Sequence, residues 1–174
     1  YTTLFRSFAV RPDTNQHIGG GRLTIEKLGD MQIAYMRRTG GYGEGNRQLM
    51  EQFKRYLREH ALLQEDTTIL GIALDDPAQI PEDRQRYDVG MILTGREDPC
   101  GLPVRTVAGG RWAVFEVPHT EEGVSDFWRD LPQRAARLPV DGTRPILERY
   151  AHPKVSAHIC EFCVPLRESK LRGI

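Results

Sequence analysis

Two hydrophobic stripes run along this chain, and their spacing predicts two helices. Between residues 44 and 63 an apolar residue returns every four positions with charged residues between, which is typical of an amphipathic helix with one buried face. A second stripe follows Glu121-Glu122-Gly123, and Pro132 lies inside it. Because proline lacks an N–H and clashes with the preceding turn, we expect this helix to kink or break near Asp130. The stripes comprise Leu49, Phe53, Leu57 and Ala61, and then Val124, Phe127, Trp128, Leu131, Ala135 and Leu138.

Runs rich in strand formers surround each helix in the same order, so both halves of the chain show the pattern strand-helix-strand-strand. Ala34 aligns with Ala113 when the halves are superposed, and further along Asp88 aligns with Glu161. One such unit has too little surface to bury its own apolar faces, so we expect two copies to share a core. The predicted strands are 31–39, 67–74, 87–93, 112–117, 145–150 and 159–166.

The predicted fold class is therefore α+β. We expect duplicated strand-helix-strand-strand units related by a pseudo-twofold axis, with antiparallel sheets and two main helices packed on them. Residues 1–22, which end in Gly19-Gly20-Gly21, are predicted to be a leader or linker. The domain spans 23–166, with halves at about 23–95 and 104–166, and residues 167–174 form a C-terminal tail.

Charge and hydropathy exclude several classes of partner. Lys and Arg number 24 and Asp and Glu number 24, so the formal net charge is zero and no basic surplus favours nucleic acid. We expect no direct nucleic-acid binding by this chain. No apolar run approaches the length of a membrane span, so we expect a cytoplasmic protein without a membrane partner. Its 3 cysteines, an odd number, fit free thiols in a reducing compartment.

Two segments of the sequence partly match a metal-binding motif and a phosphate-binding motif. His152, His158 and the pair Cys160 and Cys163 lie close together in the chain, with Cys-x-x-Cys spacing. Yet residues three apart in a strand point to opposite faces, which disfavours a shared metal. The glycine-rich turn at 39–45 lacks the Lys-Ser or Lys-Thr ending of a phosphate loop. We therefore expect no metal, no cofactor and, since no nucleophile motif occurs, no covalent catalysis.

Two glutamates stand in predicted strands, where glutamate is uncommon. Strand alternation puts Glu148 on the same face as Ile146 and Tyr150, and it likewise gives Glu161 apolar neighbours. Two interpretations stay open. Each carboxylate can point at water or pair with an arginine such as Arg149, or it can face a ligand.

The chain resembles the GyrI-like effector-binding domain, which occurs alone or after the DNA-binding part of AraC-type and MerR-type regulators. The resemblance covers roughly residues 23–166. It implies a ligand pocket between the two halves, lined by aromatic residues, with an acidic residue of the last strand facing the ligand at the position of Glu161. Its landmarks are Ile33-Ala-Tyr-Met-Arg-Arg-Thr-Gly-Gly-Tyr42, Arg86-Tyr87-Asp88, Gly109-Gly-Arg-Trp-Ala-Val-Phe115, Arg144-Pro145 with Glu148-Arg-Tyr150, and Glu161-Phe-Cys-Val-Pro-Leu166.

The resemblance leads to a hypothesis about function. We expect a domain that binds a hydrophobic or cationic aromatic small molecule, as in multidrug binding, and that acts as a sensor, as the effector arm of a transcriptional regulator with an upstream DNA-binding domain, or as a sequestering protein. The resemblance also leaves open a hydrolase of reactive cyclopropane-bearing compounds, in which Glu161 would activate water, and an inhibitor of DNA gyrase. The candidate ligand-binding residues are Glu161, Glu148, Tyr150, Trp112, Tyr42, Tyr87, Phe162 and Trp128.

Overall fold

A computed structural model describes residues 16–18 and 21–168 of the chain. Most of the predicted leader and of the C-terminal tail lies outside the described residues. The described part of the predicted leader includes a short strand, β1, and Gly21 begins the next one, β2.

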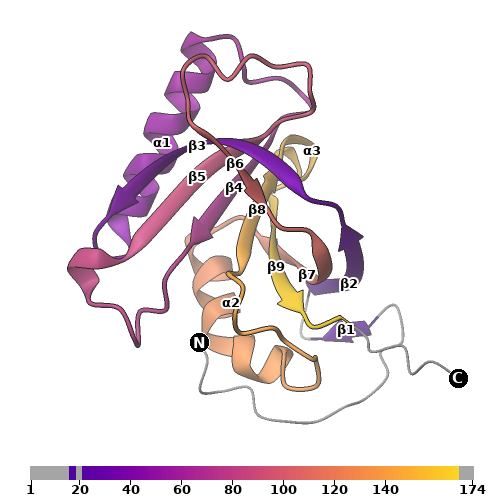
Figure 1. The fold of residues 1–174 in the computed structure, drawn as a ribbon. Helices are drawn as coiled ribbons and strands as arrows, with labels where there is room; N and C mark the ends of the chain where they lie inside the picture. The colour runs from indigo at the N-terminus through magenta and orange to yellow at the C-terminus, as the bar shows by residue number, and fades with distance from the viewer. Residues whose placement is uncertain (1–15, 19–20, 169–174) are drawn as a thin grey trace, which may run out of the picture.

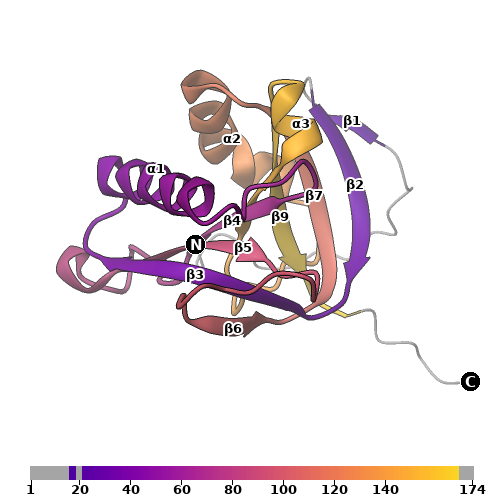
Figure 2. The same cartoon turned by 90° about the horizontal axis from the view of Figure 1, so that it is seen from above.

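One antiparallel sheet of 9 strands, in the order β1-β2-β7-β9-β8-β4-β5-β3-β6, organises the molecule, and its two long helices lie on one face of it (Figures 1 and 2). The strands are β1 (Gln16–Ile18), β2 (Gly21–Leu28), β3 (Met31–Thr39), β4 (Thr68–Ala73), β5 (Arg86–Ile92), β6 (Val104–Val107), β7 (Gly110–Pro118), β8 (Leu147–Ala151) and β9 (Ile159–Leu166). The helices are α1 (Glu44–Glu59), α2 (Glu121–Arg134), the short α3 (His152–Ser156) and the 3-10 turn η2 (Glu82–Arg84).

The strand register confirms the predicted duplication. Ala34 pairs with Val104 of β6, and Ala113 pairs with Ile25 of β2, so the two alanines hold equivalent places. The halves meet where β4 and β8 pair antiparallel. The pseudo-twofold axis passes through this pairing, and the fold is the α+β arrangement that the sequence predicts.

Three strands of the sheet were not predicted: the short β1, and the strands β2 and β6. β2 precedes β3 in the chain but pairs with β7 of the other half, whereas β6 precedes β7 but pairs with β3. Each half thus receives an outer strand from the segment that leads into the other half. The pairings of β2 with β7 and of β6 with β3 join residues far apart in sequence, so they leave no hairpin signal, and β6 has only 4 residues.

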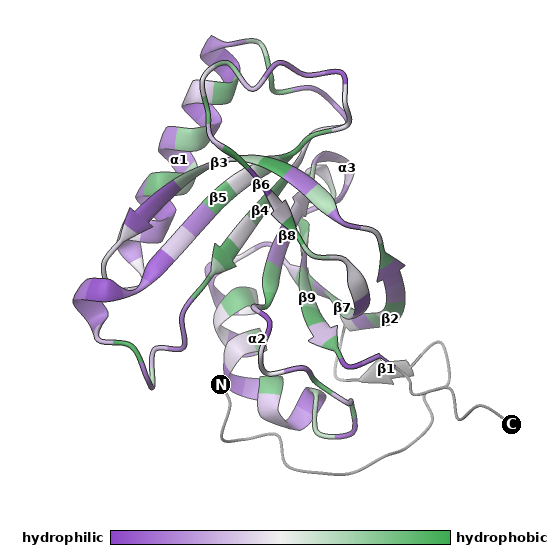
Figure 3. Ribbon diagram, in the orientation of Figure 1, coloured by the Kyte–Doolittle hydropathy of each residue, from purple (hydrophilic) through white to green (hydrophobic). Residues whose placement is uncertain are grey.

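Helix α1 forms as predicted but ends earlier than residue 63. Its apolar stripe packs on the sheet through Leu49, Phe53 and Leu57, while charged residues cover the outer face (Figure 3). The helix ends at Glu59 because Ala61 adopts a left-handed φ of 53° and the amide of Leu62 bonds back to the Leu57 carbonyl at 2.8 Å. This is the type of closure that stops a helix.

Helix α2 does not break at Asp130, so of the predicted kink or break the break does not occur. The helix continues through Pro132 to Arg134, two residues further. Proline removes one backbone hydrogen bond, but the amide of Ala135 still bonds to the Leu131 carbonyl at 2.9 Å. Phe127 and Leu131 are also buried against the sheet, and this packing outweighs one lost bond near the end of the helix.

Three groups of buried side chains hold the fold together. One lies under α1 and includes Phe53, and another lies under α2 and includes Phe127. The third occupies the opposite face, where the sheet bends so strongly that residues of both halves, such as Ile33 and Trp112, share one core (Figure 2). Burying each such side chain contributes roughly 1.5–3 kcal/mol, and the shared third core joins the halves into one unit.

Candidate functional site

The strip of sheet between α1 and α2, where β4 and β8 pair, carries the carboxylate of Glu148. Glu148 pairs with Gly71 across the axis and with Phe162 of β9. Paired residues in a sheet point to the same face. Phe162 stacks on Phe127 of α2, with ring centroids 4.1 Å apart, so Glu148 faces the helices.

Two tyrosine hydroxyls hold the Glu148 carboxylate. Tyr150 donates to its Oε2 at 2.7 Å, and Tyr87 of β5 donates to the same oxygen at 3.3 Å. No ion pair to Glu148 occurs among the described residues. Loss of hydration raises the pKa of the Glu148 carboxyl, and the two hydrogen bonds, which favour the ionised form, oppose this only in part. We name Gly71, Tyr87, Glu148 and Tyr150 the junction site.

Gly71 makes this arrangement sterically possible. A Cβ atom at this position would overlap the Tyr87 hydroxyl oxygen and would lie 3.0 Å from Oε2 of Glu148. The register makes Gly71 the pseudo-twofold counterpart of Glu148, since Gly71 pairs with Val89 of β5 as Glu148 pairs with Phe162 of β9. The duplicated fold therefore places one carboxylate, not two, at its axis.

Other aromatic residues extend the junction site. The ring of Tyr42 meets that of Tyr87 edge-on, at 6.3 Å between centroids, and its hydroxyl lies 2.9 Å from the Asp75 carbonyl oxygen. On the side of α2, Trp128 meets Phe162 edge-on at 5.3 Å. His119 packs on Tyr150 at 5.4 Å, a contact that the sequence did not reveal because the two residues lie far apart in the chain.

A cavity of about 110 Å³ opens beside the junction site. Ala73 at the end of β4 and Ile146, the residue before β8, line it, and each lies two positions along the chain from Gly71 or Glu148 on the helix side of the sheet. Trp128 of α2 forms part of the wall. The cavity and the carboxylate thus occupy neighbouring positions on one surface.

Glu161 lies on the opposite face of the sheet from Glu148. It pairs with Arg149 in the register and accepts a hydrogen bond from the Nε of Arg149 at 2.7 Å. The same guanidinium donates to both carboxylate oxygens of Glu26, at 2.9 and 3.1 Å, and Lys154 Nζ lies 3.8 Å from Glu161. The structure shows Glu161 paired with an arginine, and that this carboxylate faces a ligand stays a prediction.

The first half of the chain has an aspartate at the equivalent position, and its arginine partners are different. Asp88, the counterpart of Glu161 in the register, is fully buried and accepts hydrogen bonds from Arg37 at 2.6 Å and from Arg105 at 2.9 Å. Buried carboxylates that have arginine partners stabilise a fold only while both partners are present. Both residues therefore belong to ion pairs of the bent inner face.

Two other candidates are core residues in this structure. Trp112 is 1% exposed and lies on the inner face, where the Arg144 guanidinium stands 4.3 Å from its ring centroid. Phe162 is on the helix face but is fully buried beneath α2. The structure thus brings together Glu148, Tyr150, Tyr87, Tyr42 and Trp128, and separates Glu161 and Trp112 from them.

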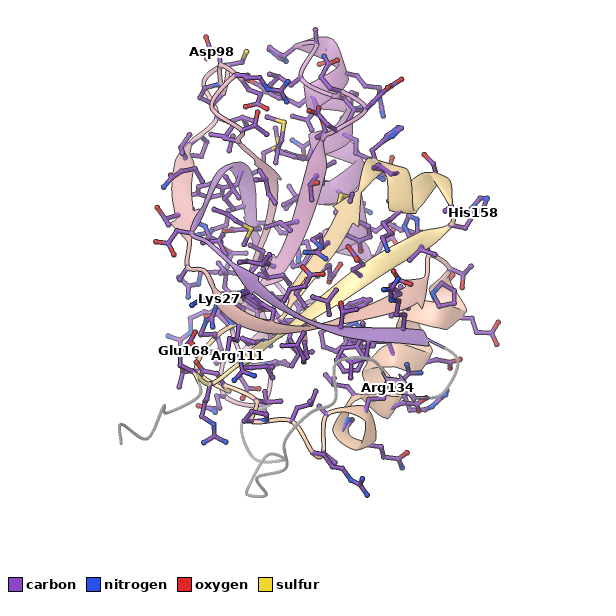
Figure 4. The ribbon with its side chains drawn as sticks, turned by 90° about the vertical axis from the view of Figure 1, so that its right-hand side faces the viewer. Lys27, Asp98, Arg111, Arg134, His158 and Glu168 are labelled. Carbon is purple, nitrogen blue, oxygen red and sulfur yellow. The ribbon has the colours of Figure 1, made fainter. Side chains whose placement is uncertain are left out.

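The cysteines of the Cys-x-x-Cys pair point to opposite faces, as strand alternation predicts. Cys160 packs under α2, whereas Cys163 joins the inner core. Burial raises the pKa of each thiol to about 12. His158, with a φ of 58°, lies exposed in the turn before β9, and Asp98 is exposed in the loop after β5 (Figure 4). Within the described residues, no three His, Cys, Asp or Glu side chains gather to hold a metal.

Comparison with known proteins places this geometry in a family. The family model of the GyrI-like small molecule binding domain matches residues 23–167. The chain belongs to this GyrI-like family. It is 39% identical over 152 residues to the SPbeta prophage-derived putative transcriptional regulator YosT of Bacillus subtilis (strain 168). The alignment covers 84% of this chain and 99% of YosT. The resemblance seen in the sequence is thereby confirmed.

Solved structures share the GyrI-like fold at low sequence identity. SAV2435 bound to tetraphenylphosphonium superposes with a TM-score of 0.61 at 14% identity, covering 86% of this chain and 96% of that one. The EcmrR C-terminal domain superposes with a TM-score of 0.61 at 9% identity, covering 85% and 98%. EcmrR in a DNA complex gives a TM-score of 0.58 at 9% identity, and there the match covers 83% of this chain and 57% of the EcmrR chain.

As a GyrI-like protein, the chain is a small-molecule-binding domain, and it is related to the putative transcriptional regulator YosT. Among the residues that the structure describes, no helix is long and apolar enough to cross a membrane.

Proposed function

We propose that the junction site binds a hydrophobic cation and that Glu148 is its anionic anchor. The observation that carries the proposal is a half-buried carboxylate on the helix-covered face of the sheet, whose hydrogen-bond partners among the described residues are tyrosine hydroxyls only. A desolvated carboxylate without a cation is unfavourable, and a cationic ligand supplies the missing charge. Tyr87, Tyr150 and Tyr42 add aromatic rings, whose faces attract cations at about 0.5–2 kcal/mol each.

The comparison with SAV2435 supports this ligand class. Tetraphenylphosphonium is a cation whose charge is surrounded by aromatic rings, and SAV2435 binds it on the same fold. At 14% identity the comparison speaks for the fold, so the ligand class for this chain rests on the chemistry of Glu148 and its tyrosines.

We propose further that ligand binding serves transcription regulation, with this chain as the sensing domain. The similarity to YosT and the fold shared with EcmrR support this role. With 24 basic and 24 acidic residues, the chain has no charge surplus for phosphate contacts, so a linked or associated DNA-binding domain would read the operator. A free-standing protein that sequesters toxic cations would use the same site.

A fluorescent cationic dye, rhodamine 6G, tests the anchor. Glu148→Gln keeps the shape of the side chain but removes its charge, and it should weaken dye binding at least tenfold, which corresponds to about 1.4 kcal/mol. The matched control is Glu161→Gln, a chemically identical change on the other face of the sheet, which should leave affinity within about twofold. Thermal melts report whether each variant is folded. A loss confined to Glu161→Gln would move the anchor to the inner face and refute the proposal.

One observation also favours a second function, a hydrolase. A carboxyl whose pKa is raised, next to two hydroxyl groups, can take a proton from water as a general base. Incubation with a strained cyclopropane electrophile, with mass spectrometry of the products, separates the two functions. Turnover that disappears in Glu148→Gln would establish the enzyme, whereas stable dye binding without turnover supports the sensor.

A further inference from the structure

The cavity beside the junction site has the lining of an apolar subsite. The apolar side chains that line it include those of Ala73, Ile146, Trp128, Val140 and Val164. Trp128 is fixed in orientation because it meets both Phe127 and Phe162 edge-on, at 5.5 and 5.3 Å. A ligand group that enters therefore meets a preformed apolar surface.

The size of the cavity restricts what it can hold. Its volume is about 110 Å³. A cavity of roughly 150 Å³ lined by apolar side chains is known to bind one benzene ring in another protein, so this space suits one small ring or a short branched alkyl group. A fused bicyclic ring exceeds it.

The position of the cavity relates it to Glu148. Ile146 lies two residues before Glu148, just ahead of β8, and Ala73 lies two residues after Gly71 at the end of β4. Two residues of strand span roughly 6.5–7 Å. A cation held by Glu148 could thus place a ring in the cavity only at the end of an arm of about that length.

The charges around the cavity agree with a cationic ligand. Asp75, Asp76 and Asp141 line it together with one basic residue, Arg144. Asp75 is paired with Arg86 at 2.8 Å, and Arg144 keeps its positive charge. Even with Asp75 neutralised, two carboxylates of the lining stand against one guanidinium, and this acidic excess favours a cation.

We propose that this cavity is an aryl subsite, so that the preferred ligands are quaternary cations with a single phenyl ring on an arm of about three carbons. This inference rests on the proposed function, because Glu148 must hold the charged end. It adds a rule of specificity that the anchor alone does not imply: ligand affinity depends on arm length and on ring size. A spherical cation uses only the junction site.

Calorimetry with three probes tests the proposal: tetramethylammonium, trimethyl(propyl)ammonium and trimethyl(3-phenylpropyl)ammonium. Burying a phenyl ring contributes roughly 1.5–3 kcal/mol, so the phenylpropyl compound should bind about ten- to a hundredfold more tightly than the propyl compound. Ala73→Leu fills the cavity and should reduce this ratio to within about twofold, while binding of tetramethylammonium stays the same. The matched control, Ala157→Leu at an exposed position after α3, should keep the full ratio.

The outcomes separate the two proposals. Absence of binding by all three cations would overturn the proposed function and the subsite with it. Binding of all three with an equal phenylpropyl-to-propyl ratio in the unmodified protein and in Ala73→Leu would overturn the subsite alone. If Ala73→Leu does not fold, Ile146→Ala provides the test by enlarging the cavity. A naphthylpropyl cation should then bind at least fivefold more tightly than it does to the unmodified protein, and no gain would refute the subsite.

Discussion

Gly71 should control the junction site although it has no side chain. In Gly71→Ala the new Cβ would overlap the Tyr87 hydroxyl oxygen and would lie 3.2 Å from Tyr87 Cζ and 3.0 Å from Glu148 Oε2. The Tyr87 ring is 3% exposed and cannot move freely. Overpacking of this kind costs about 1–3 kcal/mol. The Tyr87–Glu148 hydrogen bond, at 3.3 Å, should also break, adding roughly 0.5–1.5 kcal/mol.

The expected destabilisation of Gly71→Ala is therefore about 2–4 kcal/mol. For a chain of 174 residues each kcal/mol lowers Tm by roughly 2–4 °C, so a loss on the order of 10 °C should appear in a thermal melt. Tyr87→Phe alone should cost about 1 kcal/mol, because Tyr150 still donates to Glu148 at 2.7 Å.

The double variant decides whether this steric account is correct. Removing the Tyr87 hydroxyl removes the atom that the new Cβ overlaps, so Gly71→Ala should cost at least about 1 kcal/mol less in the Tyr87→Phe background than alone. Urea denaturation of all four proteins measures this coupling. Gly29→Ala, where a Cβ would meet nothing within 4 Å, is the control and should change stability by less than about 0.5 kcal/mol. Strictly additive effects would show that Gly71 matters for another reason.

Two further outcomes concern the titrating groups. Because burial raises the pKa of Glu148 above its ordinary value of 4.5, the folded state holds this proton more tightly than the unfolded state, and its contribution to stability is lost as pH rises from about 4.5 through the raised value. Glu148→Gln should therefore be more stable than the unmodified protein at pH 7 and equally stable at pH 4, as urea denaturation would show. If the two proteins are equally stable at both pH values, the carboxyl is not desolvated. Burial raises the pKa of Cys160 and Cys163 to about 12, so iodoacetamide at pH 8 should modify only the half-buried Cys100 in the folded protein. Mass spectrometry would show this, and rapid labelling of all 3 thiols would contradict the burial.

The two helices and the duplication could be recognised without coordinates. The apolar stripes along α1 and α2 reflect which side of each helix meets the core, and this information is local. The alignment of Ala34 with Ala113 likewise needed only the order of residues, and the register of β3 and β7 confirms it.

Only the tertiary structure shows which side chains Glu148 and Glu161 contact. Glu148 and Glu161 have similar neighbours in the sequence. Strand alternation predicts which residues share a face of the sheet, but it does not predict whether that face meets a helix, so it could not distinguish the two glutamates. Pairing of β8 with β4 puts Glu148 beside Gly71 under the gap between the helices, and pairing with β9 puts Arg149 beside Glu161. These neighbours come from distant parts of the chain. The same is true of β2 and β6, which join the opposite half, so the order of strands in the sheet determines which carboxylate pairs with an arginine and which has tyrosine hydroxyls as partners.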